Sequence, residues 1–105
     1  SMLSFFGSPY APAYSASKGG VVQLTRSLAI AWADEGIRVN AVRPGLIDTD
    51  IHADTGDVER PIRLTPFVPM KRTGQASEVA SCILWLLSED SSYVTGSLLD
   101  VSGGR

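Results

Sequence analysis

A tyrosine and a lysine lie four residues apart near the start of an alanine-rich segment, at Tyr14 and Lys18. In a helix, this spacing places the two side chains on one face, one turn apart. A phenol ordinarily has a pKa of about 10, and a cation within about 4–6 Å lowers that pKa by favouring the phenolate. Such a pair in a cleft can act as a general acid or base, whereas the same pair on an open helix surface carries no chemistry.

The pair requires a helix, and residues 13–35 are predicted to form one that Gly36 closes as a C-cap. The opposite side of this helix also carries little charge, which predicts two packing partners, a sheet and the helix of a second subunit. The face that carries Tyr14 and Lys18 is expected to continue as a buried stripe of Val21, Thr25, Leu28 and Trp32.

The rest of the chain alternates between short apolar segments and polar connections. Residues 37–43 are rich in β-branched side chains and stop at Pro44-Gly45, which indicates a strand. Apolar side chains at helical spacing predict a second helix over residues 76–89, and a last strand is predicted over residues 97–101. Residues 46–74 show weak periodicity, and we expect a lid there that contains a short helix.

This order of helices and strands is typical of an α/β protein with a parallel sheet. Two strands are too few for such a sheet, because parallel sheets are buried on both faces. The chain of 105 residues is therefore expected to be the C-terminal part of a larger fold.

Composition excludes several classes of function. The net charge of −2 gives no electrostatic reason to bind nucleic acid or an anionic membrane, and no stretch reaches the roughly 18 unbroken apolar residues of a membrane span. The single cysteine, Cys82, excludes an internal disulfide framework, so a reducing cytoplasm is the simplest compartment. The single histidine, His52, has only scattered carboxylates around it, and no metal site is predicted.

Four segments resemble the short-chain dehydrogenase/reductase family, and together they span nearly the whole chain. They are the YxxxK segment YSASKGGV (14–21), RVNAVRPGLIDT (38–49), PMKRTGQASEVA (69–80) and SYVTGSLLDVSGG (92–104). YxxxK alone is common by chance, whereas the combination at these distances is specific. Within the family, the chain looks most like bacterial sugar dehydrogenases and 3-oxoacyl-carrier-protein-reductase-like members.

The resemblance implies the C-terminal part of a Rossmann-type, doubly wound parallel sheet. It also implies hydride transfer between NAD or NADP and a secondary alcohol or ketone, with a sugar as one candidate substrate. Tyr14 would exchange the hydroxyl proton, and Lys18 would lower the pKa of the phenol and bind the nicotinamide ribose. The family's catalytic serine falls at Ser1, where it would hydrogen-bond the substrate carbonyl. Ser1-Met2 has an alternative interpretation, as a cloning remnant ahead of a start codon.

The resemblance also assigns a cofactor loop after the first strand. In the family, the loop that begins at Pro44-Gly45 passes the nicotinamide, where the backbone at Ile47 and the side chain of Thr49 hold the carboxamide. Asn40 is similar to a family asparagine with a structural role and is left out of the site. The expected cofactor-binding set is Tyr14, Lys18, Pro44, Gly45, Ile47 and Thr49.

The family's glycine-rich TGxxxGxG turn, which binds the pyrophosphate at a helix N-terminus, does not occur in this sequence. Residues 1–105 are therefore expected to be the C-terminal segment of one Rossmann domain, without its dinucleotide-binding half. Alone, the segment should be inactive and should bind NAD or NADP weakly or not at all. The parent is expected to be a homo-oligomer, a dimer or tetramer formed through the first helix and the last strand. The alternative is a truncated, non-catalytic fragment that acts as a self-associating or partner-binding module.

Overall fold

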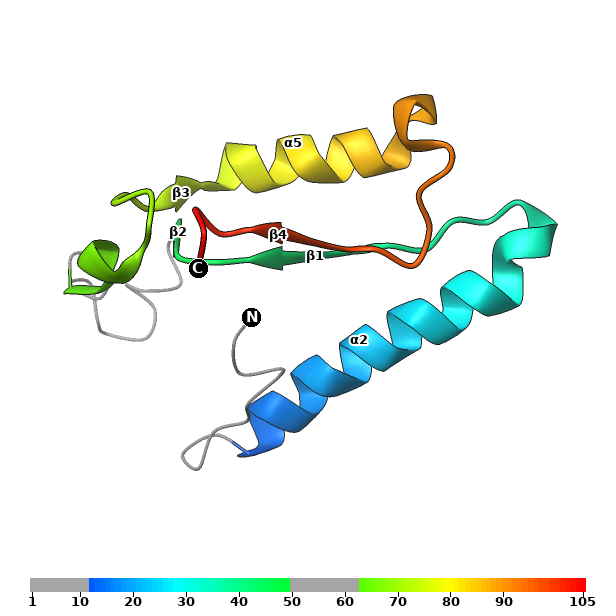
Figure 1. The fold of residues 1–105 in the computed structure, drawn as a ribbon, viewed down its shortest axis with the longest axis horizontal. Coiled ribbons are helices and arrows are strands. Elements are labelled where there is room, and N and C mark those ends of the chain that lie inside the picture. The colour runs from blue at the N-terminus through cyan, green and yellow to red at the C-terminus, as the bar shows by residue number, and fades with distance from the viewer. Residues whose placement is uncertain (1–11, 50–62) are drawn as a thin grey trace.

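The computed structural model describes residues 12–49 and 63–105 of the chain. Within these residues, helices α2 and α5 are joined to short strands and 3-10 turns (Figure 1). In chain order the elements are α2 (Pro12–Trp32), η1 (Ala33–Glu35), β1 (Ala41–Pro44), β2 (Ile47–Asp48), η2 (Thr65–Phe67), β3 (Gly74–Gln75), α5 (Ala76–Leu87), η3 (Glu89–Ser91) and β4 (Leu98–Val101).

The centre of the structure is a parallel pair of strands, β1 and β4. Their register runs from Ala41 opposite Leu98 to Pro44 opposite Val101. The Gly45 N–H extends the ladder by donating to the Val101 carbonyl at 2.9 Å. Helix α5 lies on one side of this pair and α2 on the other (Figure 1). The α/β architecture with parallel strands that the sequence predicts is therefore confirmed.

A second parallel pair forms where the sequence predicts only a lid. Strand β2 pairs with β3, with Ile47 opposite Gly74, and the Gly74 N–H donates to the Leu46 carbonyl at 2.9 Å. A side chain at position 74 would bring its Cβ to 2.8 Å from the Ile47 Cδ1 atom, so glycine permits the close pairing. In the described part of this segment, residues 63–64 are helical and the 3-10 turn η2 follows them, while residues 50–62 lie outside the description.

The predicted strand over residues 37–43 begins four residues too early, because β1 starts at Ala41. Residues 39 and 40, just before β1, are held by hydrogen bonds that involve side chains and not by backbone pairing with a neighbouring strand. The Asn40 amide donates to the Val94 carbonyl at 3.0 Å and accepts the Ser97 N–H at 3.0 Å. The Val39 N–H donates to the Thr95 hydroxyl at 3.0 Å. These bonds give Asn40 the structural role that was expected of it.

Helix α2 ends as predicted, with Gly36 in the left-handed conformation at φ 77° after the 3-10 turn η1. Its buried stripe agrees with the predicted one at Thr25, which is buried, and at Leu28, which is half-buried, and differs elsewhere. The side chains at positions 18, 22, 25 and 29 are buried or half-buried, whereas Val21 is 54% and Trp32 39% exposed. The stripe passes through small side chains because Ala29 lies close to the turn at Gly96, where an added Cβ would be 3.4 Å from the Ala29 Cβ.

Few apolar side chains are buried within the described residues. The buried hydrophobic ones are Ala29, Val68 and Leu86, while Ile30 on α2 and Leu87 on α5 are 81% and 75% exposed. The radius of gyration, 15.4 Å, exceeds the roughly 13 Å of a compact domain of this length. Both helices therefore present apolar surface outward. Neither is long and apolar enough, within the described residues, to cross a membrane.

Arg38 ties the end of α5 to the chain just before β1. Its Nη2 donates to the carbonyls of Leu86 and Ser88 at 2.8 and 3.2 Å, and its Nη1 donates to the Val94 carbonyl at 3.1 Å and the Ser91 hydroxyl at 3.2 Å. The last carbonyls of a helix have no partner within the helix, and a cation there is also favoured by the helix dipole. The planar guanidinium therefore closes α5 and positions β1 at once.

We expect Arg38→Met to lower the free energy of unfolding by about 2–3 kcal/mol, because it removes the charged hydrogen bonds that join the end of α5 to the residues before β1. Arg38→Lys should recover only part of this loss, since an ammonium lacks the planar fork. Urea unfolding of the protein measures the effect. The control is Arg26→Met, which removes the same charge from an exposed position on α2. Equal stabilities of the Arg38→Met and Arg26→Met variants would contradict the assignment.

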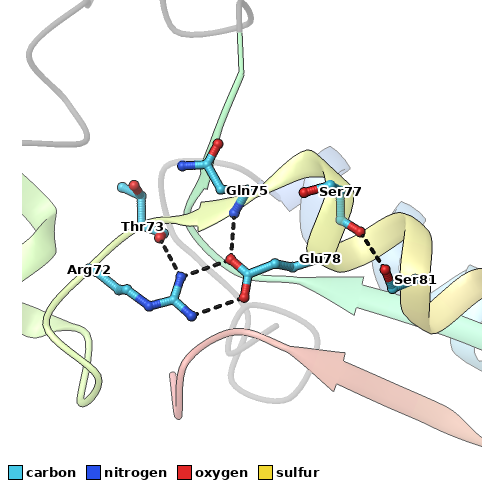
Figure 2. Close-up of polar contacts among 6 residues, drawn as sticks. All are labelled: Arg72, Thr73, Gln75, Ser77, Glu78 and Ser81. Carbon is cyan, nitrogen blue, oxygen red and sulfur yellow. Dashed lines mark hydrogen bonds and ion pairs between the residues drawn. The ribbon is translucent and has the colours of Figure 1, made fainter.

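Arg72 and Glu78 form a two-pronged ion pair at the start of α5 (Figure 2). The two nitrogen–oxygen distances are 2.8 and 2.9 Å, and the same carboxylate accepts the Gln75 backbone N–H at 3.0 Å. The hydrogen bonds from Arg72, and then that from Gln75, lower the pKa of the Glu78 carboxyl from 4.5 to about 2. Both side chains are about half exposed, so the pair stabilises the fold only slightly.

The Glu78 pKa gives this small contribution a defined pH dependence. It is fully present above about pH 4.5, the unfolded pKa, and is lost as the pH falls toward the folded pKa of about 2. Glu78→Gln should therefore lower the melting temperature slightly at neutral pH, and the difference from the parent should shrink in acid. Thermal unfolding over this pH range tests it, with Glu35→Gln on η1 as the matched charge control. A difference that grows in acid would contradict the pair's role.

Candidate active site

The starts of both helices and the carboxyl ends of β1 and β4 lie at the same edge of the structure (Figure 1). This follows from connectivity, because each helix runs antiparallel to the strand that follows it. In open parallel α/β sheets, ligands bind in the crevice outside the carboxyl ends of the strands. The segments that carry Tyr14, Lys18 and residues 44–49 begin or end at this edge.

Position 14 lies in the first part of α2, one helical turn before Lys18. Lys18 is half-buried and stands at the head of the inward stripe that continues through Thr25 and Ala29. Lys18 therefore lies on the same face of α2 as the buried Thr25 and Ala29. The side chain of Tyr14 and the whole of Ser1 lie outside the described residues.

The loop after β1 is held in place at its first residue. The Gly45 N–H bonds to Val101, and a Cβ at Gly45 would come within 2.8 Å of the Ser102 Cα. Glycine is therefore required for this close approach between the loop and the chain after β4. Two residues on, Ile47 is half-buried in β2. Thr49 follows β2 and is exposed, so its side chain is open to a ligand.

A pocket of about 230 Å³ adjoins this loop, between β2, the start of α5 and the end of β4. Two ion pairs border it. Arg72 and Glu78 form one, and Asp100 accepts two hydrogen bonds from Arg43 at 2.8 and 3.0 Å to form the other. Neither pair was expected from the sequence. The Arg43–Asp100 pair depends on the β1–β4 register, which residue types alone do not predict.

The structure thus brings Pro44, Gly45, Ile47 and Thr49 together at the edge where α2 begins. Lys18 lies on the helix that starts at that edge. Among the described residues, no group of three or more histidine, cysteine or acidic side chains has the arrangement of a metal site. Cys82 is half-buried on α5, and His52 lies outside the described residues.

Comparison with known proteins identifies relatives along the whole chain. Residues 1–105 match the family described as "Enoyl-(Acyl carrier protein) reductase". The chain is 50% identical to "Uncharacterized oxidoreductase YgfF" of Escherichia coli over 107 residues, covering 100% of this chain and 43% of that protein. It is 48% identical to "Glucose 1-dehydrogenase 2" of Bacillus subtilis, covering 87% of this chain and 35% of that protein.

Solved structures show the same likeness. A crystal structure with bound NADP, of an Agrobacterium tumefaciens protein provisionally named a 2-deoxy-d-gluconate 3-dehydrogenase, superposes with a TM-score of 0.86 at 39% identity. The match covers 99% of this chain and 43% of that one. A 3-oxoacyl-[acyl-carrier protein] reductase from Brucella melitensis with bound NAD superposes with a TM-score of 0.74 at 40% identity. That match covers 87% of this chain and 32% of the reductase chain.

The chain therefore spans less than half the length of these relatives. The four recognised motifs, the family match over every residue and the superposition all agree. The chain belongs to the short-chain dehydrogenase/reductase family, and its fold is that of the carboxyl-terminal part of the family's Rossmann fold.

Proposed function

We propose that this sequence is the carboxyl-terminal part of an NAD(P)-dependent oxidoreductase that interconverts a secondary alcohol and a ketone. The observation that carries the proposal is the shared edge, where α2 with Lys18 begins and where the loop of residues 44–49 leaves β1. Bound NADP and NAD in two related structures support a nicotinamide cofactor. The exposed Thr49 and the glycine-locked turn at Gly45 suit a loop that receives a flat carboxamide.

In this proposal, residues of this chain transfer the proton and hold the substrate and the cofactor in position. The nicotinamide, when bound, supplies or accepts the hydride. During carbonyl reduction, Tyr14 donates its phenolic proton to the substrate oxygen, and during alcohol oxidation its phenolate accepts that proton. Lys18 favours the phenolate by its positive charge and donates a hydrogen bond to the nicotinamide ribose. Ser1 hydrogen-bonds the substrate oxygen, and the Ile47 backbone and Thr49 side chain hold the carboxamide.

The adenosine and pyrophosphate of the cofactor need a binding segment that this sequence does not contain. We therefore place residues 1–105 in one Rossmann domain whose dinucleotide-binding half precedes them. The shares of 43% and 35% of the curated relatives' lengths fit this arrangement. Without that half, the chain is expected to be inactive and to bind NAD or NADP weakly or not at all.

A sugar or similar polyol is the substrate class we favour, because relatives named for glucose and a gluconate are among the most similar proteins. The parent is proposed to be a dimer or tetramer formed through α2 and β4. The outward apolar side chains of α2, such as Leu24 and Ile30, support this surface. The same exposed surface also fits the alternative, a non-catalytic module that associates with itself or with a partner.

Tyr14→Phe in the full-length enzyme should reduce turnover by about 10²–10⁴-fold, because it removes the transferable proton and keeps the ring. Cofactor affinity should change little. Steady-state kinetics with NAD and NADP, and with a panel of sugars and short ketones, provides the measurement. Tyr93→Phe is the matched control, since Tyr93 is fully exposed after η3. Substantial turnover by Tyr14→Phe at any pH would remove Tyr14 as the acid or base.

Lys18→Met should lower both turnover and cofactor affinity, because it removes a charge beside the phenol and a donor to the ribose. Loss of a neighbouring cation raises the pKa of a phenol, so alkaline pH should partly restore alcohol oxidation in this variant. It should not restore Tyr14→Phe, which has no proton to lose. A pH–rate profile measures this, with Arg26→Met as a charge control on the same helix. Identical profiles for Lys18→Met and Arg26→Met would refute the role of Lys18.

A further inference from the structure

Residues 102–104, which follow β4, are packed between two other segments. On one side lies the loop after β1, where an added Cβ at Gly45 would meet both Cα and Cβ of Ser102 at 2.8 Å. On the other side lie residues 68–70, and the Met70 N–H donates to the Gly103 carbonyl at 3.0 Å. The turn therefore acts as a spacer between the cofactor loop and the segment that leads to β3.

Gly103 has the backbone and the surroundings that only glycine satisfies. Its φ of 65° is in the left-handed region, which disfavours side chains. A Cβ there would lie 2.9 Å from the Val68 Cγ1 and 3.5 Å from the Met70 Cβ. Val68 is 1% exposed, so it is enclosed and has little room to move away. Adding one methyl group would therefore push the turn away from residue 68.

The direction of that push matters because Ser102 is the residue just before Gly103. Ser102 lies so near Gly45 that no side chain fits between them, since an added Cβ at Gly45 would be 2.8 Å from the Ser102 Cα. A displaced turn would press on the loop that β1 and β2 hold, at residues 45–47. Small errors in the placement of a group that contacts a ligand weaken binding, even when the ligand and that group are chemically unchanged.

We propose that Gly103 is a positioning residue for the nicotinamide end of the cofactor, which acts by fixing Ser102 against Gly45. This inference rests on the proposed function, since it takes residues 44–49 as the nicotinamide loop. Ser102 lies against Gly45, the second residue of that loop. The effect should therefore be confined to the nicotinamide half of the cofactor.

The test compares two ligands on the full-length protein that contains this sequence. The first is NADH or NADPH, whichever the parent binds. The second is the matching adenosine fragment, which is adenosine diphosphate or, for NADPH, its form with the extra ribose phosphate. Gly103→Ala should weaken the whole cofactor by about tenfold while the fragment binds within about twofold of the parent. Isothermal titration calorimetry measures both dissociation constants.

Gly36→Ala is the matched control. Gly36 has nearly the same left-handed φ, 77°, but an added Cβ there would meet nothing within 4 Å. Gly36→Ala places a side chain on a left-handed backbone but creates no clash with a neighbouring residue. Both ligands should therefore bind to this variant as they bind to the parent. Val68→Ala supplies a second variant if Gly103→Ala does not fold. It removes the methyl groups that support the turn, and it should weaken the whole cofactor about threefold with no effect on the fragment.

Each result decides the question. Equal losses for cofactor and fragment, or no loss for either, would overturn the positioning role while the proposed function stands. A loss with Gly36→Ala as large as that with Gly103→Ala would overturn it too, as would unchanged cofactor binding by Val68→Ala. A parent protein that binds neither NADH nor NADPH would instead overturn the proposed function, and the positioning role with it.

Discussion

The parallel register of β1 against β4 places every other described part of the molecule. It sets Arg43 opposite Asp100, brings Gly45 against the chain after Val101, and fixes the end from which the loop of residues 44–49 departs. Helix α5 must cross over the strand pair to connect the two, and Arg38 holds the end of that crossover. The candidate site is therefore a product of one strand pairing and not of any single motif.

The elements that depend on local sequence were predictable. The alanine-rich run before Gly36 and the apolar spacing after Gly74 gave α2 and α5 nearly in full. The start of β1 was predicted wrongly because Asn40 bonds to residues 54 and 57 positions away. The stripe of α2 was predicted only in part: Thr25 and Leu28 turn inward as expected, whereas Val21 and Trp32 do not, and Ala29 lies against the turn at Gly96. Strands β2 and β3 are two residues each, too short for periodicity to reveal.

The same distinction between local sequence and long-range contacts applies to the candidate site. Lys18 and residues 44–49 were identified from family motifs, and the structure brings their segments to one edge. The ion pairs Arg43–Asp100 and Arg72–Glu78 and the packing of Gly103 on Val68 were not identified. These contacts join segments through the fold, so no spacing in the sequence marks them. Two glycines near the end of a sequence suggest a flexible tail. Here Gly103 and Gly104 pack so closely against Val68 and Pro69 that an added Cβ would lie 2.9 Å from either neighbour.

Arg43 and Asp100 are 57 residues apart in the chain, and they meet across the pair of β1 and β4. In the described residues, β1 has no other strand partner. Closing a loop of that length costs about 3–4 kcal/mol of chain entropy before any contact forms. Contacts of such long range also slow folding, because the native topology must be found by diffusion of the chain. During synthesis α2 can form as soon as it leaves the ribosome. The loop of residues 44–49, by contrast, lacks its bond from Gly45 to Val101 until the last strand, β4, has emerged.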